Sequence, residues 1–205
     1  MIEKLTSTIC CEKEYIKAIK QGYTKLFKSV ENELKTQLTK KAHEDSIISF
    51  QKNLKELLLT KPNYNKTILA IDPGFRTGCK LAILDKHTNP QEFDKIFLDK
   101  KEYSIQKIKS LISKYSCDCI VIGNGTASNE TFELLSQEIE IPFIIVNESG
   151  ASVYSASKIG AQEFKNLDAT DRGTISIGRR YIDPLSELIK IPVESIGVGM
   201  YQHDI

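Results

Sequence analysis

The segment ILAIDPGFRTG, residues 68–78, constrains the fold more than any other part of the chain. Its apolar, partly β-branched start is typical of a short strand that is buried on both faces. Asp72 follows directly, and Pro73-Gly74 with Gly78 predict a turn in which the backbone can bend tightly and approach a ligand. Open α/β sheets place their ligand sites beyond the carboxyl ends of their strands. The segment therefore predicts both a buried strand and a site at Asp72.

Further short apolar runs, separated by turn residues, predict the rest of a sheet. They are Cys79–Leu84, Phe93–Leu98, Cys119–Ile122 and Phe143–Val146. Apolar residues at helical spacing predict helices over Ser104–Tyr115, Ser128–Glu140, Ala151–Phe164 and Thr170–Ile182. Three successive strands followed by alternating helices and strands imply a mixed sheet with helices on its faces. The predicted fold is α/β: residues 66–183 form an RNase H-like mixed five-stranded sheet with flanking helices.

An all-helical segment is expected to precede the sheet, over residues 1–62. It lacks proline before Pro62, and its apolar residues recur at helical spacing, which predicts a shorter helix and a long one joined near residues 22–29. Residues 1–66 hold 13 lysines and 8 acidic residues. This excess suits either a phosphate backbone or a solvated helix face, and the solvated face is the simpler interpretation.

Composition excludes several classes of protein. With 40% hydrophobic and 27% charged residues, the chain is neither disordered nor collagen-like. No apolar run approaches the roughly 20 residues that span a bilayer, and charges near the start argue against a signal peptide. The five cysteines and three histidines show no zinc-site spacing. We therefore expect a cytoplasmic protein with reduced thiols and no membrane partner.

Carboxylates at the predicted carboxyl edge of the sheet raise the question of a nuclease. In two-metal nucleases of this fold, an aspartate placed like Asp72 joins two or three more carboxylates around two divalent ions. Glu148 follows the fifth strand, and Asp168 or Asp171 lies near the start of a late helix. The fourth strand ends at Asn124 instead of a carboxylate, so the set is incomplete for hydrolysis. A Mg²⁺ or Mn²⁺ ion at Asp72 and Glu148 is one interpretation, and a turn-capping role for Asp72 is the other.

Other polar side chains near this edge are candidates for contact with a nucleic acid. Two turns rich in small residues, GNGTAS and ESGAS, each open a predicted helix, where backbone N–H groups can bind an anion. The candidates are Arg76, Asn124, Thr126, Ser149, Arg172 and Arg179. Ordinary helix capping by the polar residues, and salt bridges of the arginines within their own domain, are the alternatives.

Five longer segments carry a family resemblance. In chain order they are IDPGFRTGCKLAILD, IVIGNGTASNET, VNESGASVYSAS, RGTISIGRRYIDPLSELIKI and SIGVGMYQHDI. Together they closely resemble the YqgF-type, RNase H-like domain of the Tex family of bacterial transcription accessory proteins. The preceding helical stretch resembles the Tex segment just before that domain, so the likeness runs from about Gly22 to the end of the chain.

The resemblance implies a cytoplasmic transcription accessory factor that binds RNA or DNA, contacts the transcription machinery and requires no cofactor. It matches Asp72 and Glu148 to acidic positions of related nucleases, in a domain thought to have lost its complete acidic set. Hydrolysis is therefore not expected, and a metal-dependent nuclease or resolvase of RuvC/YqgF type is the alternative. The resemblance also implies that residues 184–205 lead toward a helix-hairpin-helix region and an OB-fold domain, which makes this chain a fragment.

Overall fold

A computed structural model describes residues 13–198, so predictions for residues 1–12 and 199–205 lie outside the described residues. The chain divides into two compact units, with the boundary between Gln51 and Lys52. Each unit is described by itself. No helix within residues 13–198 is long and apolar enough to cross a membrane.

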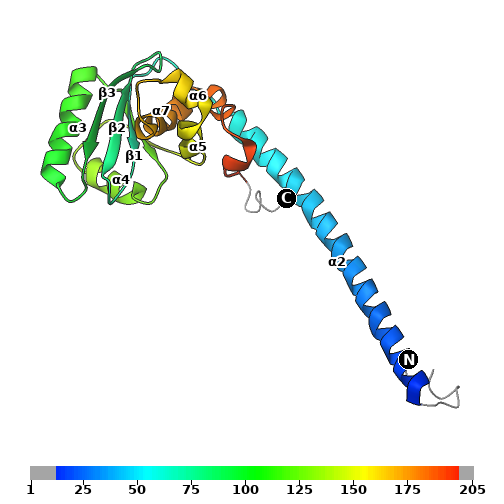
Figure 1. The fold of residues 1–205 in the computed structure, drawn as a ribbon. Coiled ribbons are helices and arrows are strands. Elements are labelled where there is room, and N and C mark those ends of the chain that lie inside the picture. The colour runs from blue at the N-terminus through cyan, green and yellow to red at the C-terminus, as the bar shows by residue number, and fades with distance from the viewer. Residues whose placement is uncertain (1–12, 199–205) are drawn as a thin grey trace. The chain divides into compact units, whose positions relative to one another are not determined.

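Helix α2 runs from Lys13 to Leu58 without a break (Figure 1). The prediction of two helices joined near residues 22–29 is therefore wrong. A single glycine such as Gly22 costs a helix only about 1 kcal/mol relative to alanine, which is too little to end a helix that continues on both sides. Exposed pairs one turn apart, such as Glu31 and Lys35 at 2.7 Å, support it locally. None of its residues is buried.

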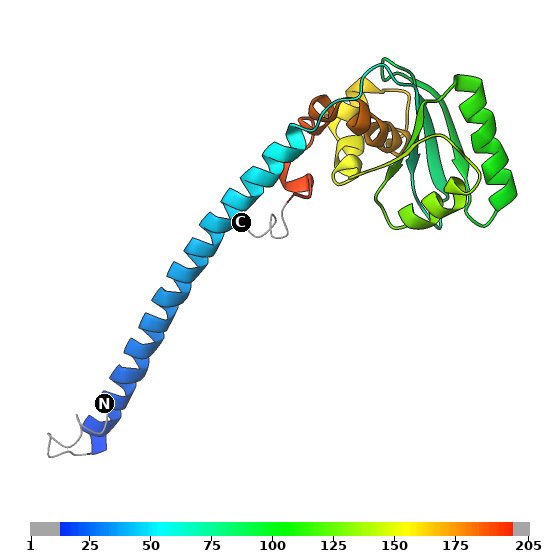
Figure 2. The same cartoon turned by 180° about the vertical axis from the view of Figure 1, so that it is seen from behind.

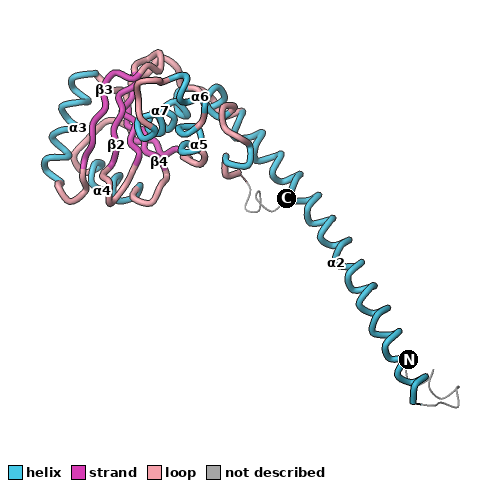
Figure 3. The backbone as a smooth tube through the Cα atoms, in the orientation of Figure 1, coloured by secondary structure: helices cyan, strands magenta, loops and turns pink. Residues whose placement is uncertain are grey.

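The second unit contains a five-stranded sheet of order β3-β2-β1-β4-β5 (Figure 3). The strands are β1 (Ile68–Asp72), β2 (Cys79–Leu84), β3 (Pro90–Ile96), β4 (Cys119–Gly123) and β5 (Phe143–Val146). β1, β2 and β3 pair antiparallel in a meander, whereas β4 pairs parallel with both β1 and β5. The predicted α/β fold with a mixed RNase H-like sheet is confirmed. β3 begins earlier than predicted, at Pro90, because the first position of an edge strand tolerates proline.

Helices cover both faces of this sheet (Figures 1 and 2). The helices of this unit are α3 (Lys101–Tyr115), α4 (Ser128–Ser136), α5 (Ala151–Ala156), α6 (Lys158–Glu163), α7 (Ala169–Ile182), α8 (Pro184–Leu188) and the 3₁₀ turn η1 (Val193–Ser195). The predicted helical stretch 151–164 is interrupted at Ser157, whose hydroxyl accepts a hydrogen bond from the Gly160 N–H and so caps α6.

Alternate residues of the central strand β1 face two separate cores. Leu69 and Ile71 pack with α3 and α4 on one face. Ile68 and Ala70 pack with α5 and α7 on the other. All four side chains are fully buried, as expected of a strand covered on both sides. The central position of β1 carries its last residue, Asp72, to the middle of the sheet's carboxyl edge.

A third core joins the two ends of the second unit. Tyr154, Leu188, Ile191 and Ile196 form its buried centre, and the last turns of α2 pack against it through Leu54, Leu57 and Leu58. The described part of the predicted connector, residues 184–198, thus supplies α8 and η1 to the packing of the domain.

Candidate functional site

Asp72 is held by an ion pair across the β1–β2 hairpin. It lies directly opposite Lys80 in the antiparallel register, and the Lys80 Nζ is 3.3 Å from the Asp72 Oδ2. The side chain of Lys80 is 24% exposed and that of Asp72 is 23% exposed. Water therefore screens this ion pair only partly. The sequence patterns did not single out Lys80. Its ammonium offsets the charge of Asp72, which the sequence makes a candidate metal ligand.

Glu148 occupies the space at the end of β4, where the strand itself supplies no acidic residue. Its backbone N–H donates to the Asn124 Oδ1 at 3.0 Å, which fixes the loop after β5. Its carboxylate lies against Gly123 and Gly125, and a Cβ at either glycine would overlap a carboxylate oxygen. Neither glycine has a positive φ, so glycine is needed here for space and not for backbone conformation. The two glycines form a cradle for the carboxylate of Glu148.

The environment of Glu148 raises the pKa of its carboxyl group. Burial raises the pKa of Glu148, and the negative charge of Asp72 raises it further. A hydrogen bond from the Gly125 backbone and the charges of Arg180 and Lys80 act in the opposite direction but are weaker. Among the described residues, the buried Oε2 of Glu148 has no hydrogen-bond partner. Ionisation of Glu148 is therefore less favourable than ionisation of a solvated glutamate.

A cavity of about 270 Å³ lies at this edge of the sheet. Its lining consists of Asp72, Lys80, Glu148, Ala151, Ser152, Ser155, Ala169, Thr170, Gly173 and Ile177. Asp168 and Asp171 are not part of it. Asp168 caps α7 by accepting a hydrogen bond from the Asp171 N–H at 2.8 Å. The structure thus brings two of the four candidate carboxylates into one cavity.

These side chains do not fit the two-metal centre of a nuclease. Within residues 13–198, no three His, Cys, Asp or Glu side chains are placed to hold a metal ion. Of the two carboxylates in the cavity, Asp72 is paired with a lysine and Glu148 has a raised pKa. A single divalent ion at Asp72 and Glu148 stays a prediction.

The predicted phosphate-binding residues fall into two groups. Arg172 donates to the carbonyl oxygens of Ser155 and Leu167, and Arg179 donates to that of Thr88 and to Glu163. Both guanidinium groups therefore hold their own domain together. By contrast, the side chains of Arg76, Asn124 and Thr126 are exposed in the loops that follow β1 and β4, and Ser149 is half-buried after β5. These four remain accessible to a ligand at the carboxyl edge.

Comparison with known proteins agrees with this fold and this edge. The family described as Tex protein YqgF-like domain matches residues 66–182, from the start of β1 to the end of α7. The chain belongs to this family. The predicted resemblance to Tex is therefore confirmed, and the match includes both Asp72 and Glu148.

Relatives of this Tex-family chain occur in bacteria and in animals. The protein YdcI of Bacillus subtilis is 42% identical over 197 residues, which cover 91% of this chain and 27% of YdcI. The transcriptional accessory protein Tex of Neisseria gonorrhoeae is 42% identical over 88% of this chain and 25% of its own length. The human S1 RNA-binding domain-containing protein 1 is 40% identical over 84% of this chain and 18% of its own length. The chain thus spans about a quarter, or less, of these relatives.

Proposed function

We propose that this chain is part of a nucleic-acid-binding transcription accessory factor whose YqgF-like domain does not hydrolyse its ligand. The observation that carries the proposal is the position of the Glu148 carboxylate against Gly123 and Gly125. There burial and Asp72 raise the pKa of Glu148, while Asp72 is paired with Lys80. Phosphodiester cleavage by two metal ions requires several ionised carboxylates that converge on the ions. The edge brings two carboxylates into one cavity, fewer than such cleavage needs.

The names of the relatives support the binding part of the proposal. One is called a transcriptional accessory protein and another an S1 RNA-binding domain-containing protein. We infer that RNA or DNA and the transcription machinery are the partners of the whole protein. Most of the length of these relatives lies outside the matched portion. Helix-hairpin-helix and OB-fold domains in the unmatched part of the whole protein would supply further nucleic-acid affinity.

A cleavage assay tests the non-hydrolytic part. The chain is incubated with end-labelled branched DNA and with structured RNA, in Mg²⁺ or Mn²⁺, beside a matched Asp72→Asn variant. We expect no cleavage above that of the variant, together with binding that weakens as salt rises. Cleavage by the unmodified chain that disappears in Asp72→Asn would instead establish the metal-dependent nuclease.

A further inference from the structure

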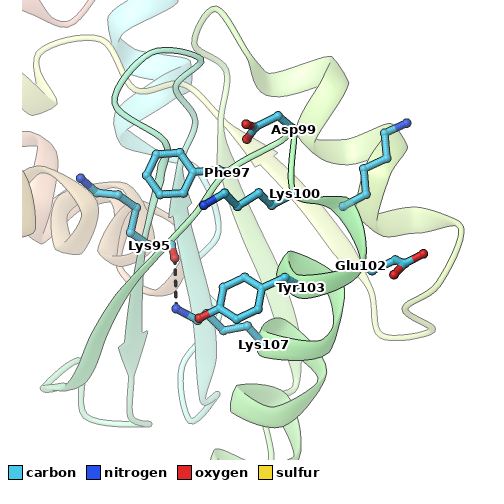
Figure 4. Close-up of a pocket in the computed structure, with 8 residues that line it drawn as sticks. Lys95, Phe97, Asp99, Lys100, Glu102, Tyr103 and Lys107 are labelled. Atoms are coloured by element: carbon cyan, nitrogen blue, oxygen red, sulfur yellow. Dashed lines mark hydrogen bonds between the residues drawn. The ribbon is translucent and has the colours of Figure 1, made fainter.

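An open groove lies where β3 leads into α3, outside the cavity at Asp72. It has a volume of about 840 Å³ and is shown in Figure 4. Its lining consists of Lys95, Phe97, Asp99, Lys100, Lys101, Glu102, Tyr103 and Lys107. Four of these eight residues are lysines, and two are aromatic. We call it the lysine–aromatic groove.

The backbone that carries this groove is fixed. The carbonyl oxygen of Phe97 accepts a hydrogen bond from the Ser104 hydroxyl at 2.9 Å and another from the Lys100 N–H at 3.1 Å. Ser104 is fully buried, so these bonds are shielded from water. The turn therefore presents its side chains from a rigid base, which lowers the entropy cost of binding a ligand.

Two lysines of the groove lie at the N-terminus of helix α3, where positive charges are unusual. Lys100 is the N-cap of α3 and Lys101 its first residue, and the cap makes no side-chain hydrogen bond. Helix starts favour acidic residues, because the N–H groups there carry partial positive charge. Two lysines at such a start are electrostatically unfavourable, and the acidic residues beside them are Asp99, just before the cap, and Glu102, in the first turn. Backbone N–H groups and ammonium groups together suit a phosphate.

A further lysine in the groove is held in its charged form. The Nζ of Lys107 lies 2.7 Å from the Asp94 Oδ1 and donates to the backbone oxygen of Lys95. The hydrogen bond to Asp94 raises the pKa of Lys107, and this effect exceeds the lowering caused by burial. The positive charge of Lys107 is therefore paired with Asp94 and does not add to the net charge of the groove.

Two aromatic rings in the same groove are exposed to solvent. Phe97 is 37% exposed and Tyr103 is 57% exposed. The Lys100 Nζ lies 5.7 Å from the centre of the Phe97 ring, and the Lys107 Nζ lies 5.0 Å from that of Tyr103. In Figure 4 the ammonium of Lys100 extends between the two rings, while Glu102 points away from them. Exposed rings beside lysines are the pattern with which proteins bind single-stranded nucleic acid, because unpaired bases stack on the rings.

We propose that the lysine–aromatic groove binds single-stranded nucleic acid, with phosphates at Lys100 and Lys101 and bases stacked on Phe97 and Tyr103. This inference rests on the proposed nucleic-acid binding and gives it a location. A double helix would satisfy the lysines but has no free base faces for the rings. An acidic protein would likewise leave both rings without a function. The lysines of the groove continue onto the sheet, because Lys95 lies directly opposite Lys80, the partner of Asp72.

Fluorescence anisotropy with labelled oligonucleotides of about 12 nucleotides tests the proposal, using oligo(U), oligo(dT) and a duplex as three probes. The charge variant is Lys100→Gln with Lys101→Gln, and its matched control is Lys158→Gln with Lys165→Gln, two exposed lysines elsewhere on the domain. The stacking variant is Tyr103→Ala, matched by Tyr64→Ala, because both tyrosines are 57% exposed. Circular dichroism verifies that every variant is folded.

We expect the charge variant to lower the slope of log K against log salt by about 1.4, at about 0.7 for each phosphate that is no longer neutralised. Tyr103→Ala should weaken binding of the single strands about five-fold or more, and the control variants should change neither quantity. Single-strand binding that is unchanged in both groove variants would place the ligand elsewhere and overturn this inference while leaving the proposed function intact. Tighter binding of the duplex than of either single strand would also overturn it. If no probe binds at about 50 mM salt, where phosphate neutralisation is still strongly favourable, the proposed nucleic-acid binding itself fails for this chain.

Discussion

Replacement of Gly123 by alanine tests whether Glu148 truly occupies the end of β4. A Cβ at Gly123 would overlap the Glu148 Oε2 and would come within 3.1 Å of the Ile177 Cδ1. Gly123 is the last residue of a buried strand and is paired with β5, so its backbone cannot easily move away. The carboxylate of Glu148 must therefore shift toward Asp72, which repels it, or the strand must distort.

The size of the effect follows from two opposing contributions. Overpacking of this kind costs about 1–3 kcal/mol. Replacing a glycine that has no positive φ returns about 0.4–1 kcal/mol, because the unfolded chain loses conformational freedom. We expect Gly123→Ala to lower the free energy of unfolding by up to about 2.6 kcal/mol. In a Glu148→Ala background the overlap is absent and only the contact with Ile177 remains, so the cost should nearly vanish.

Urea denaturation of the parent, the two single variants and the double variant gives the coupling energy directly. We expect a coupling of about 1–2 kcal/mol that favours the double variant. Gly178→Ala serves as a control, because its Cβ would meet Leu84 and Ala70 and not Glu148. It should destabilise equally with and without Glu148. If the effects of Gly123→Ala and Glu148→Ala on the free energy of unfolding are additive within about 0.5 kcal/mol, the claim that Gly123 makes room for the Glu148 carboxylate is refuted.

Two further predictions concern protonation. Because its folded-state pKa is raised, Glu148 favours folding below its ordinary pKa of 4.5 and loses that contribution as the pH rises through the folded value. Glu148→Gln should therefore melt at a higher temperature than the parent at about pH 8 and at the same temperature near pH 4; a gap that widens on acidification would contradict the raised pKa. Burial also raises the pKa of Cys117 to about 12 and that of Cys119 above its usual value. In a variant with Cys10 and Cys11 replaced by serine, Ellman's reagent at about pH 8 should label Cys79, Cys117 and Cys119 only after unfolding, and rapid labelling of the native chain would count against this packing.

The fold could be predicted from the sequence because its local signals agree with one another. The apolar run of residues 68–71 is buried on both faces, as its composition requires. Each later strand is separated from it by a turn or by a helical stripe, and this order leaves few arrangements of a sheet. The errors arose where one local signal was given too much weight. Gly22 suggested a joint, although a lone glycine cannot outweigh the helix on either side of it.

The candidate site was harder to predict, because its main features join residues distant in the chain. Asp72 and Glu148 could be assigned to one edge from strand order alone. The pairing of Asp72 with Lys80 depends on the hairpin register, which β2, apolar at every position except Lys80, does not reveal. The role of Gly123 depends on a side chain from beyond the next strand, and no local pattern reveals it.

The lysine–aromatic groove shows a different limit of sequence patterns. The apolar spacing predicts a helix from Ser104, whereas α3 begins at Lys101. Rules for helix starts look for serine, aspartate or proline, and Lys100-Lys101 is the opposite of that signal. Such rules place these lysines in a loop, where their charges do not indicate an anion-binding site. Once they are placed on the first turn of a helix, the same residues become electrostatically unfavourable and point to an anion.

The position of the proposed groove would let a sheet of this kind bind a nucleic acid without hydrolysing it. Cleavage depends on carboxylates at the ends of β1, β4 and β5, whereas the groove depends on β3 and the start of α3. The two cores that support these elements contain no residue of the Asp72 cavity apart from Ala151 and Ile177. Substitutions that neutralise the carboxylates therefore leave the packing beneath the groove unchanged. Binding by lysines and aromatic rings needs no metal ion, so it does not depend on the acidic set.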